Sequence, residues 1–206
     1  MKNLIFDVGG VLIGYRWKEL FMDDFGLSDE GAEELGRIIF DDPIWPDYDR
    51  GFVKTDALVD HYCKAYPESE YYFKRLIYEN DKMATEREAV WAKIASLKDS
   101  GYGIYILSNY SEYLFKKHTG HMPFGKLLDG GIVSYEVGAI KPEPAIYKML
   151  LDKYALDPAT CIFFDDIEKN VEAARKFGIE SFLVTSEEDL LERLSVFDRH
   201  RKDSHA

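Results

Sequence analysis

Six polar residues stand directly after short apolar runs of the sequence or on the loop that follows one. They are Asp7, Ser108, Asn109, Lys141, Asp165 and Asp166. Together they offer a carboxylate nucleophile, hydrogen-bond donors, a cation and oxygen ligands for a metal ion. If the apolar runs are parallel strands, their carboxyl ends meet at one edge of a sheet, where ligands bind in open α/β folds. The pattern therefore predicts a single site suited to attack on a phosphoryl group.

The apolar runs have the length and composition of buried strands. We expect strands at Asn3 to Phe6, Gly103 to Leu107, Gly131 to Ser134, Cys161 to Phe164 and Ser181 to Val184. Longer amphipathic segments lie between most of them, for example Pro144 to Tyr154 and Glu168 to Phe177. This alternation predicts an α/β fold in which parallel strands are joined by crossover helices.

The segment from about Tyr15 to Ala84 interrupts the alternation, because it has helical periodicity, many aromatic and acidic residues and no convincing strand. Helices are expected at Glu19 to Phe25, Asp29 to Phe40, Thr55 to Ala65 and Ser69 to Tyr78, with prolines between some of them. We therefore expect two units. One is a core formed by residues 1–14 and 85–206, and the other is an inserted helical subdomain formed by residues 15–84.

The adjacent acids Asp165 and Asp166 are the most distinctive feature of the set. They follow an apolar run that ends at Phe164, so two like charges would emerge together from a buried strand, which is costly without a cation. Mg²⁺ prefers carboxylate oxygens, and Asp7, the carbonyl of Gly9 and Asp166 would form part of its shell, with Asp165 nearby. The same acids could instead cap the following helix, whose first turn favours negative charge. The two interpretations are compatible.

Asp7 and Lys141 could supply the chemistry of attack. A carboxylate at a strand end can attack phosphorus and form an aspartyl phosphate, which divides one difficult hydrolysis into two easier steps. Gly9 and Gly10 would let the backbone bend closely around the phosphate. Lys141 could neutralise charge on the phosphate and on the nucleophile. Taken singly, however, an aspartate at a strand end is more often a turn residue, and a lysine is more often a solvated surface group.

The other polar residues carry weaker signals. Ser108 and Asn109 could donate hydrogen bonds to the transferring group, although Ser-Asn is also a common loop pair. Asn170 is expected to have a supporting role or to lie on an ordinary helix surface. The histidines show no metal-ligand spacing, and we expect His118 and His121 to be exposed on a loop.

The segments FDVGGVL, ILSNY, AIKPEPAIY and FFDDIEKN occur in this order and resemble the four motifs of the haloacid dehalogenase (HAD) superfamily. The resemblance covers nearly the whole chain. The inserted segment is similar to the helical C1-type cap of the group that includes sugar-phosphate phosphatases, such as the bacterial glucose-1-phosphate phosphatases. The resemblance implies a three-layer Rossmann-like core and Mg²⁺-dependent phosphatase chemistry. It assigns catalysis to Asp7 and Lys141, phosphate binding to Gly10, Ser108, Asn109 and Lys141, and Mg²⁺ binding to Asp7, Gly9, Asp165 and Asp166.

The sequence departs from that pattern at Gly9. Active phosphatases of the superfamily usually have a second aspartate here, which protonates the leaving group and then activates water. General acid–base help is typically worth roughly a hundred- to ten-thousand-fold, so its loss should slow poor leaving groups most. An anomeric sugar phosphate or an acyl phosphate would then suit the site better than an alkyl phosphate, and an acid of the cap or an ordered water could replace the missing group. The bacterial glucose-1-phosphate phosphatases also lack this aspartate, whereas a phosphoglucomutase depends on it.

Composition narrows the choice of partners and location. The formal net charge of -12 repels long polyanions, so a nucleic-acid groove is not expected. No apolar run approaches the length of a bilayer span or a signal-peptide core, so we expect no membrane association and a cytoplasmic protein. The two cysteines form no disulfide or zinc pattern. The expected partner is a small phosphorylated metabolite, and the sequence predicts no oligomeric state.

Two other functions use the same residues. A haloacid dehalogenase would employ the same nucleophile, but it needs a halide cradle and no metal, which leaves Asp165 and Asp166 unexplained. A catalytically impaired member of the superfamily could bind a phosphorylated ligand or a protein without turnover, as Gly9 and the aromatic-rich insertion suggest. Some aromatic residues of the insertion could line a substrate pocket, although most are expected to pack in the core of the insertion. They are Phe40, Trp45, Tyr48, Phe52, Tyr71, Tyr72 and Phe73. The polar residues Arg199 to Ala206 are expected to fray.

Overall fold

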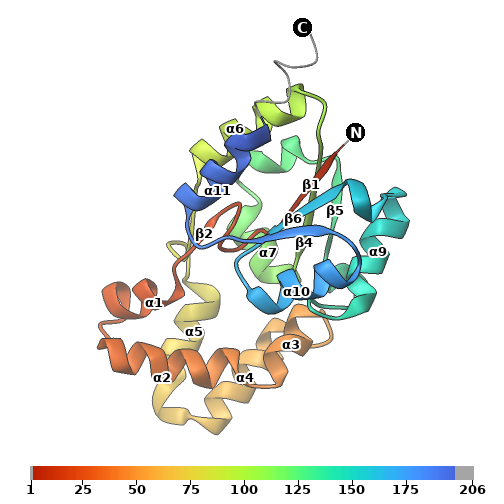
Figure 1. Ribbon diagram of the computed structural model, residues 1–206. Coiled ribbons are helices and arrows are strands. Elements are labelled where there is room, and N and C mark those ends of the chain that lie inside the picture. Colours follow the sequence, from red (N-terminus) through yellow and green to blue (C-terminus); the bar gives the residue numbers. More distant parts are fainter. Residues whose placement is uncertain (1, 198–206) are drawn as a thin grey trace, which may run out of the picture.

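A five-stranded parallel sheet forms the middle layer of a three-layer α/β fold in the computed structural model, which describes residues 2–197 (Figure 1). Its strands are β1 Asn3–Phe6, β4 Gly103–Ser108, β5 Gly130–Val133, β6 Cys161–Asp165 and β7 Glu180–Leu183. They lie in the order β5-β4-β1-β6-β7, which places β1 at the centre. The predicted α/β class and parallel sheet are confirmed. The expected fraying at Arg199 to Ala206 lies outside the described residues.

Pairing between neighbours sets the strand ends, and each predicted strand agrees with the structure to within one residue. The third predicted strand was expected to include Ser134. In the structure Val133 pairs with Ser108, the last residue of β4, and Ser134 begins the short helix α8 Ser134–Val137. A sequence pattern of apolar residues gives no such limit, because the end of a strand depends on where its partner ends.

Alternate side chains along the strands pack against different helices. Leu4 and Phe6 of β1 belong to the core beneath α6 Glu88–Asp99 and α11 Glu187–Ser195. Ile5, between them, points to the opposite face, beneath α9 Pro144–Tyr154 and α10 Glu168–Lys176. This is the period of two that a strand imposes. Helices therefore cover both faces of the sheet (Figure 1).

The helical insertion lies at the carboxyl ends of the strands (Figure 1). The chain enters and leaves it through an antiparallel pair, β2 Gly14–Tyr15 and β3 Ala84–Thr85. These strands were not predicted, because two residues are too few for an alternating pattern. The elements between them are α1 Trp17–Glu19, a π-helical turn Leu20–Asp24, α2 Asp29–Phe40, α3 Ile44–Asp49, α4 Thr55–Ala65, a 3-10 turn Pro67–Ser69 and α5 Glu70–Tyr78. The single helix expected at Glu19 to Phe25 is thus replaced by α1 and the π-helical turn.

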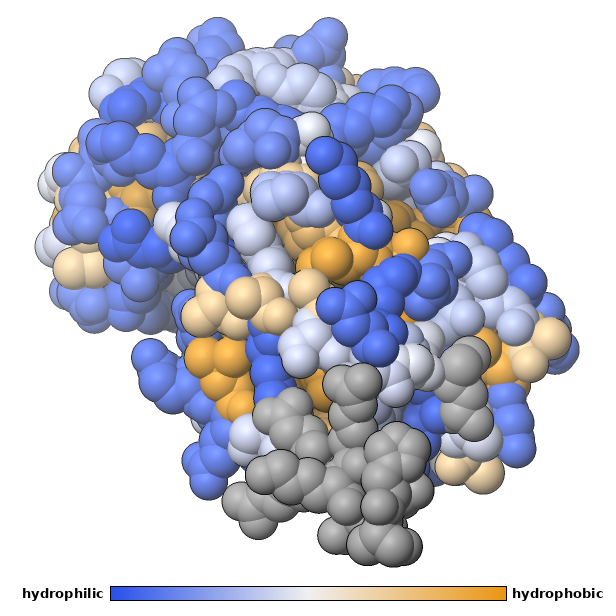
Figure 2. Space-filling view, turned by 90° about the horizontal axis from the view of Figure 1, so that it is seen from above, coloured by the Kyte–Doolittle hydropathy of each residue, from blue (hydrophilic) through white to orange (hydrophobic). Residues whose placement is uncertain are grey.

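The remaining elements join the strands of the core. They are α7 Glu112–Thr119 and the 3-10 turns Pro123–Leu127 and Pro158–Thr160. Among the described residues, no helix combines the length and apolar character needed to cross a membrane. On the face opposite the insertion, apolar side chains occur in separate groups among hydrophilic ones (Figure 2).

Candidate functional site

A cavity of about 290 Å³ lies where the carboxyl ends of the strands face the helical insertion. The predicted site residues that line it are Asp7, Gly9, Asn109, Lys141 and Asp166. The insertion contributes Tyr15, Phe40, Trp45, Pro46 and Asp49. Three further predicted residues, Gly10, Ser108 and Asp165, are next to lining residues in the sequence but do not line the cavity themselves. The strand ends therefore bring the predicted residues together, as the sequence pattern requires.

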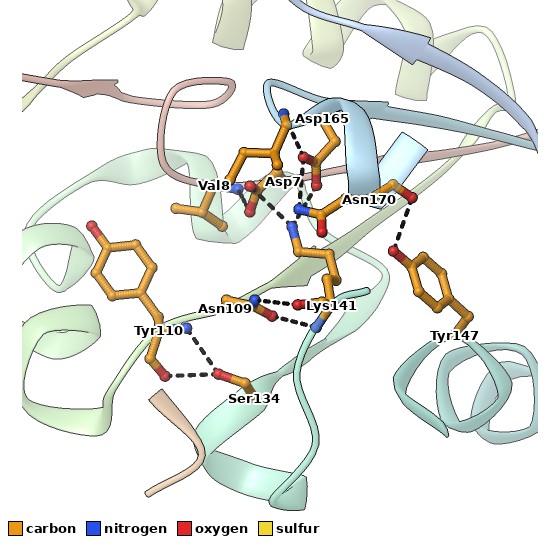
Figure 3. Close-up of polar contacts among 10 residues, drawn as sticks. Asp7, Val8, Asn109, Tyr110, Ser134, Lys141, Tyr147, Asp165 and Asn170 are labelled. Atoms are coloured by element: carbon orange, nitrogen blue, oxygen red, sulfur yellow. Dashed lines mark hydrogen bonds and ion pairs between the residues drawn. The ribbon is translucent and has the colours of Figure 1, made fainter. Parts of the chain in front are cut away.

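Lys141 lies between two carboxylates at the floor of the site (Figure 3). Its Nζ donates to Asp165 Oδ2 at 2.6 Å and lies 2.9 Å from Asp7 Oδ2. The residue is only 2% exposed. Burial opposes its charge, but the carboxylates of Asp165 and Asp7 outweigh that effect and raise the pKa of Lys141. The expectation of a solvated surface lysine is thus excluded, and the ammonium is a fixed charge beside the candidate nucleophile.

Asp7 follows β1 directly, and its carboxylate is held from two sides. Its Oδ1 accepts a hydrogen bond from the backbone amide of Val8 at 2.7 Å, and its Oδ2 faces Lys141. Burial raises the pKa of Asp7 to about 6, Lys141 lowers it and Asp165 raises it again. Most Asp7 side chains are therefore ionised at neutral pH, as a nucleophile requires.

Asp165, unlike its neighbour, is fully buried, and both of its oxygens are occupied. Oδ2 binds Lys141, while Oδ1 accepts from the Ile167 amide at 2.9 Å and from the Asn170 side chain at 3.0 Å. Asn170 is itself buried, and its backbone carbonyl oxygen accepts a hydrogen bond from the Tyr147 hydroxyl (Figure 3). Asp165 thus holds Lys141 in place and begins the turn into α10, and Asn170 does not lie on an ordinary helix surface.

The carboxylates of Asp7, Asp165 and Asp166 form a compact acidic cluster, with one potential ligand atom of each within 4.8 Å of the others. Asp166 is exposed and lines the cavity. Its carboxyl group, however, lies against Gly10, and the partial loss of water there, together with Asp7 and Asp165, raises its pKa to about 7. The cluster therefore carries more negative charge than Lys141 balances. Carboxylate oxygens crowded in this way fit a divalent cation such as Mg²⁺.

Gly10 is required by the position of Asp166. A Cβ atom at residue 10 would lie 2.2 Å from Asp166 Oδ2, and the backbone there has φ +73°. Only glycine combines that conformation with so close an approach. Gly9 differs, because a Cβ there would meet nothing closer than 3.7 Å, at the ring of Tyr15. Gly10 therefore places the acid beside the Asp7 loop, whereas residue 9 has room for a side chain.

Ser108 and Asn109 end β4 and begin the loop after it. Asn109 lines the cavity, but its side chain also clasps the backbone of Lys141. Nδ2 donates to the Lys141 carbonyl at 2.9 Å, and Oδ1 accepts from the Lys141 amide at 2.7 Å (Figure 3). The Ser108 hydroxyl is buried beside Asp7 and favours its charged form, yet has no hydrogen bond of regular geometry to any described residue. The Ser108 hydroxyl thus lies beside the candidate nucleophile, whereas the Asn109 side chain mainly positions Lys141.

His118 corrects an expectation from the sequence. It lies in α7 and is 2% exposed, and its Nδ1 is 2.8 Å from the hydroxyl of Tyr110, which lines the cavity. Burial lowers the pKa of His118 to about 4, so the ring is neutral. His121, by contrast, is exposed as expected. The buried histidine supports the cavity wall through Tyr110, and the sequence could not reveal this because tertiary packing rather than local polarity covers the ring.

The aromatic residues singled out in the insertion divide into three groups. Phe40 and Trp45 line the cavity, with ring centroids 4.9 Å apart. Tyr48 and Phe73 are buried in the core of the insertion, and Tyr72 packs against that core. Phe52 and Tyr71 are exposed. The cavity wall on the insertion side is therefore largely aromatic.

Asp49 is a cavity residue that sequence patterns did not identify. It ends α3, and Tyr-Asp-Arg-Gly is an ordinary end for a helix. Burial raises the pKa of Asp49 to about 7, and Asp7 adds to the rise, while a contact with the Ser111 amide, Arg50 and Lys141 oppose it. The one available signal was an acidic residue in the insertion, which lies opposite a site that has no general acid at position 9.

Comparison with known proteins places this geometry in context. A family model described as a haloacid dehalogenase-like hydrolase matches residues 1–178. Drimenol cyclase drtB of Aspergillus calidoustus is 25% identical over 95% of this chain, which spans only 36% of that protein. Sesquiterpene phosphatase astK of Aspergillus oryzae is 25% identical over 89% of this chain and 90% of its own length. Among solved structures, the magnesium complex of the HAD family enzyme bt-2542 from Bacteroides thetaiotaomicron is similar with a TM-score of 0.73 and 23% identity, covering 89% of this chain and 93% of that one.

Proposed function

The chain belongs to the haloacid dehalogenase-like hydrolase family, and from that premise we propose that it is a Mg²⁺-dependent phosphatase acting on a small phosphorylated metabolite. The observation that carries the proposal is the carboxylate of Asp7, which lines the cavity 2.9 Å from the Lys141 ammonium and within an acidic cluster. The sesquiterpene phosphatase relative and the magnesium complex of the structural neighbour support the same chemistry.

Each residue of the site has a role in this proposal. Asp7 attacks phosphorus and becomes an aspartyl phosphate, which water then hydrolyses. Lys141 neutralises charge on Asp7 and on the phosphoryl oxygens, and Ser108, Asn109 and the Gly10 backbone contact those oxygens. Bound by Asp7, the Gly9 carbonyl and Asp166, with Asp165 behind them, Mg²⁺ would neutralise phosphoryl charge and keep Asp7 ionised. Because phosphoryl transfer depends mainly on positioning and charge, these groups suffice for turnover of a good leaving group.

The helical segment 15–84 acts as a cap in this proposal, and it selects the substrate. Its side of the cavity is formed by Tyr15, Phe40 and Trp45 together with Asp49. Aromatic faces bind the apolar faces of sugars and other compact organic groups. We therefore propose a sugar phosphate, of the kind cleaved by glucose-1-phosphate phosphatases, as the first substrate class to test. Its anomeric leaving group suits a site that has glycine at position 9.

The site is less suited to a dehalogenase. A halide product needs a cradle of positive charge, but Lys141, the ammonium at the floor, is already bound by Asp7 and Asp165. The acidic cluster beside it would repel a halide and attract a cation.

The test measures phosphate release from sugar phosphates, nucleotides, acyl phosphates and aryl phosphates, with Mg²⁺ or with EDTA. We expect release that requires Mg²⁺ and is abolished in Asp7→Asn, together with a phosphorylated Asp7 detectable by mass spectrometry after rapid quenching. Asp60→Asn, which removes an exposed carboxylate of α4, serves as the matched control and should retain activity. Absence of release from every substrate, or full activity of Asp7→Asn, would contradict the proposal.

A further inference from the structure

The site lacks an obvious group to protonate the leaving oxygen. Asp7 is committed to attack, Asp166 is assigned to the proposed Mg²⁺ ion, Asp165 has both oxygens occupied, and position 9 carries no side chain. Lys141 is held by two carboxylates, which raise its pKa and make it a poor proton donor. A donor must therefore come from the opposite wall of the cavity, which the insertion supplies.

Asp49 is the carboxyl group that the insertion brings into this cavity. The charge of Asp7 raises the pKa of Asp49 and that of Lys141 lowers it, so Asp49 lies within electrostatic reach of both groups. Its position as the last residue of α3 gains nothing from the helix dipole, which disfavours negative charge at that end. The end of this helix thus disfavours the charged form of an aspartate. It suits a carboxyl group that must be protonated during part of its function.

The chain from Asp49 to Gly51 is fastened to the core. Ser134, at the start of α8, donates its hydroxyl to the Asp49 carbonyl at 2.6 Å. Arg50 forms an ion pair with Glu143, on the loop before α9. Gly51 lies so close to the backbone of Tyr135 that a Cβ there would be 3.0 Å from the Tyr135 carbonyl oxygen. Three successive residues therefore contact the core, and the Asp49 side chain is presented from a fixed backbone.

The surroundings of Asp49 keep its proton available near neutral pH. Burial and Asp7 raise its pKa, Arg50 and Lys141 lower it, and the result is about 7. Three phenols, Tyr15, Tyr48 and Tyr110, also face it and remain protonated, because burial raises their pKa values. A carboxyl group with a pKa near the working pH can both give and take a proton, as a general acid–base catalyst must.

We propose that Asp49, on the cap, is the general acid and base of the reaction. It would do the work of the aspartate that active relatives usually have at the position of Gly9, and the inference rests on the proposed phosphatase function. As Asp7 attacks phosphorus and the bond to the leaving oxygen breaks, the Asp49 proton passes to that oxygen and an alcohol leaves. Asp49, now a carboxylate, removes a proton from the water that attacks the aspartyl phosphate. The bond between phosphorus and Asp7 then breaks, which releases phosphate and regenerates Asp7 and protonated Asp49.

The experiment compares kcat/KM of the wild type and Asp49→Asn on three phosphates of similar shape whose leaving groups become steadily more basic: para-nitrophenyl, phenyl and benzyl phosphate. kcat/KM is chosen because it reports the first transfer, in which the acid acts. We expect a loss of about a hundredfold or more on benzyl phosphate and of less than about tenfold on para-nitrophenyl phosphate, since a good leaving group needs little protonation. Activity on the latter also shows that the variant folds.

Asp47→Asn is the matched control, because Asp47 lies two residues earlier on α3, is half-exposed and does not line the cavity. It should affect all three substrates alike. A loss in Asp49→Asn that is equal on all three would overturn the acid role while leaving the phosphatase standing. A wild type that releases no phosphate from any of them, with or without Mg²⁺, would overturn both proposals together.

Discussion

Replacing Lys141 by methionine tests the electrostatic arrangement of the site without relying on activity. The side chains have similar lengths, so the substitution removes the charge with little change of volume. Asp7 and Asp165 would then be buried beside each other without the ammonium that lies 2.9 and 2.6 Å from them. Removing one partner of a buried ion pair costs about 3–5 kcal/mol, because the remaining charge is uncompensated.

The assay is thermal unfolding in EDTA at several pH values. For a protein of this size each kcal/mol shifts the midpoint by roughly 2–4 °C, so Lys141→Met should melt about 6–20 °C below the wild type at pH 8. The loss should shrink as the pH falls. Without the ammonium, which lowers the pKa of Asp7, that pKa rises further in the folded state. The folded protein then binds a proton that the unfolded chain does not, and acid stabilises it relative to neutral pH.

Lys148→Met is the matched control, since Lys148 is an exposed residue of α9 that pairs with Asp152 one turn away. An exposed pair of this kind contributes about 0–1 kcal/mol, so the midpoint should hardly move. Our account of the site would be refuted if Lys141→Met melted with the wild type at pH 8, or if its destabilisation grew towards acid pH. Added Mg²⁺ should restore part of the lost stability at pH 8, because it returns positive charge to the cluster.

Three further predictions concern the Asp7 loop and the acidic cluster. Gly10→Ala should weaken activation by Mg²⁺ at least tenfold in a titration of phosphate release, because the added Cβ displaces the Asp166 carboxylate. The control Gly9→Ala should leave the activation constant nearly unchanged, because a Cβ has room there. Gly9→Asp should raise kcat/KM on benzyl phosphate in the Asp49→Asn variant, since position 9 has room for a side chain; no gain would show that an acid there cannot reach the leaving oxygen. In EDTA the free energy of unfolding of the wild type should fall as pH rises from about 4 to about 7, because the raised pKa values of Asp7, Asp49 and Asp166 in the folded state outweigh the lowered pKa of His118. Urea unfolding across that range checks the sign, and a rise in stability would contradict it.

The strands and the edge at which the site forms could be predicted from the sequence. Short apolar runs between amphipathic segments have few alternatives to a parallel sheet with crossover helices, and parallel strands necessarily end at the same edge. Asp7 and Asp166 lie at the ends of such runs and Lys141 on the loop after one, so connectivity brings all three to the same edge of the sheet. The gap at Gly9 was equally visible, because it is a matter of residue type at one position.

Only the tertiary structure decided what each polar side chain contacts. Asp165 and Asp166 are adjacent and chemically identical, yet the backbone turns one inwards to Lys141 and the other towards the cavity. The Asn109 side chain hydrogen-bonds to the backbone of Lys141, a residue distant in the sequence. His118 is buried by tertiary packing that its local sequence does not indicate. Asp49 reaches the site because Ser134, Glu143 and Tyr135 hold the cap's loop against the core. Local sequence determines which groups a segment carries and which way its strands run. Contacts between distant segments depend instead on side-chain packing in three dimensions. Those contacts determine the charge, the proton affinity and the role of each side chain in the site.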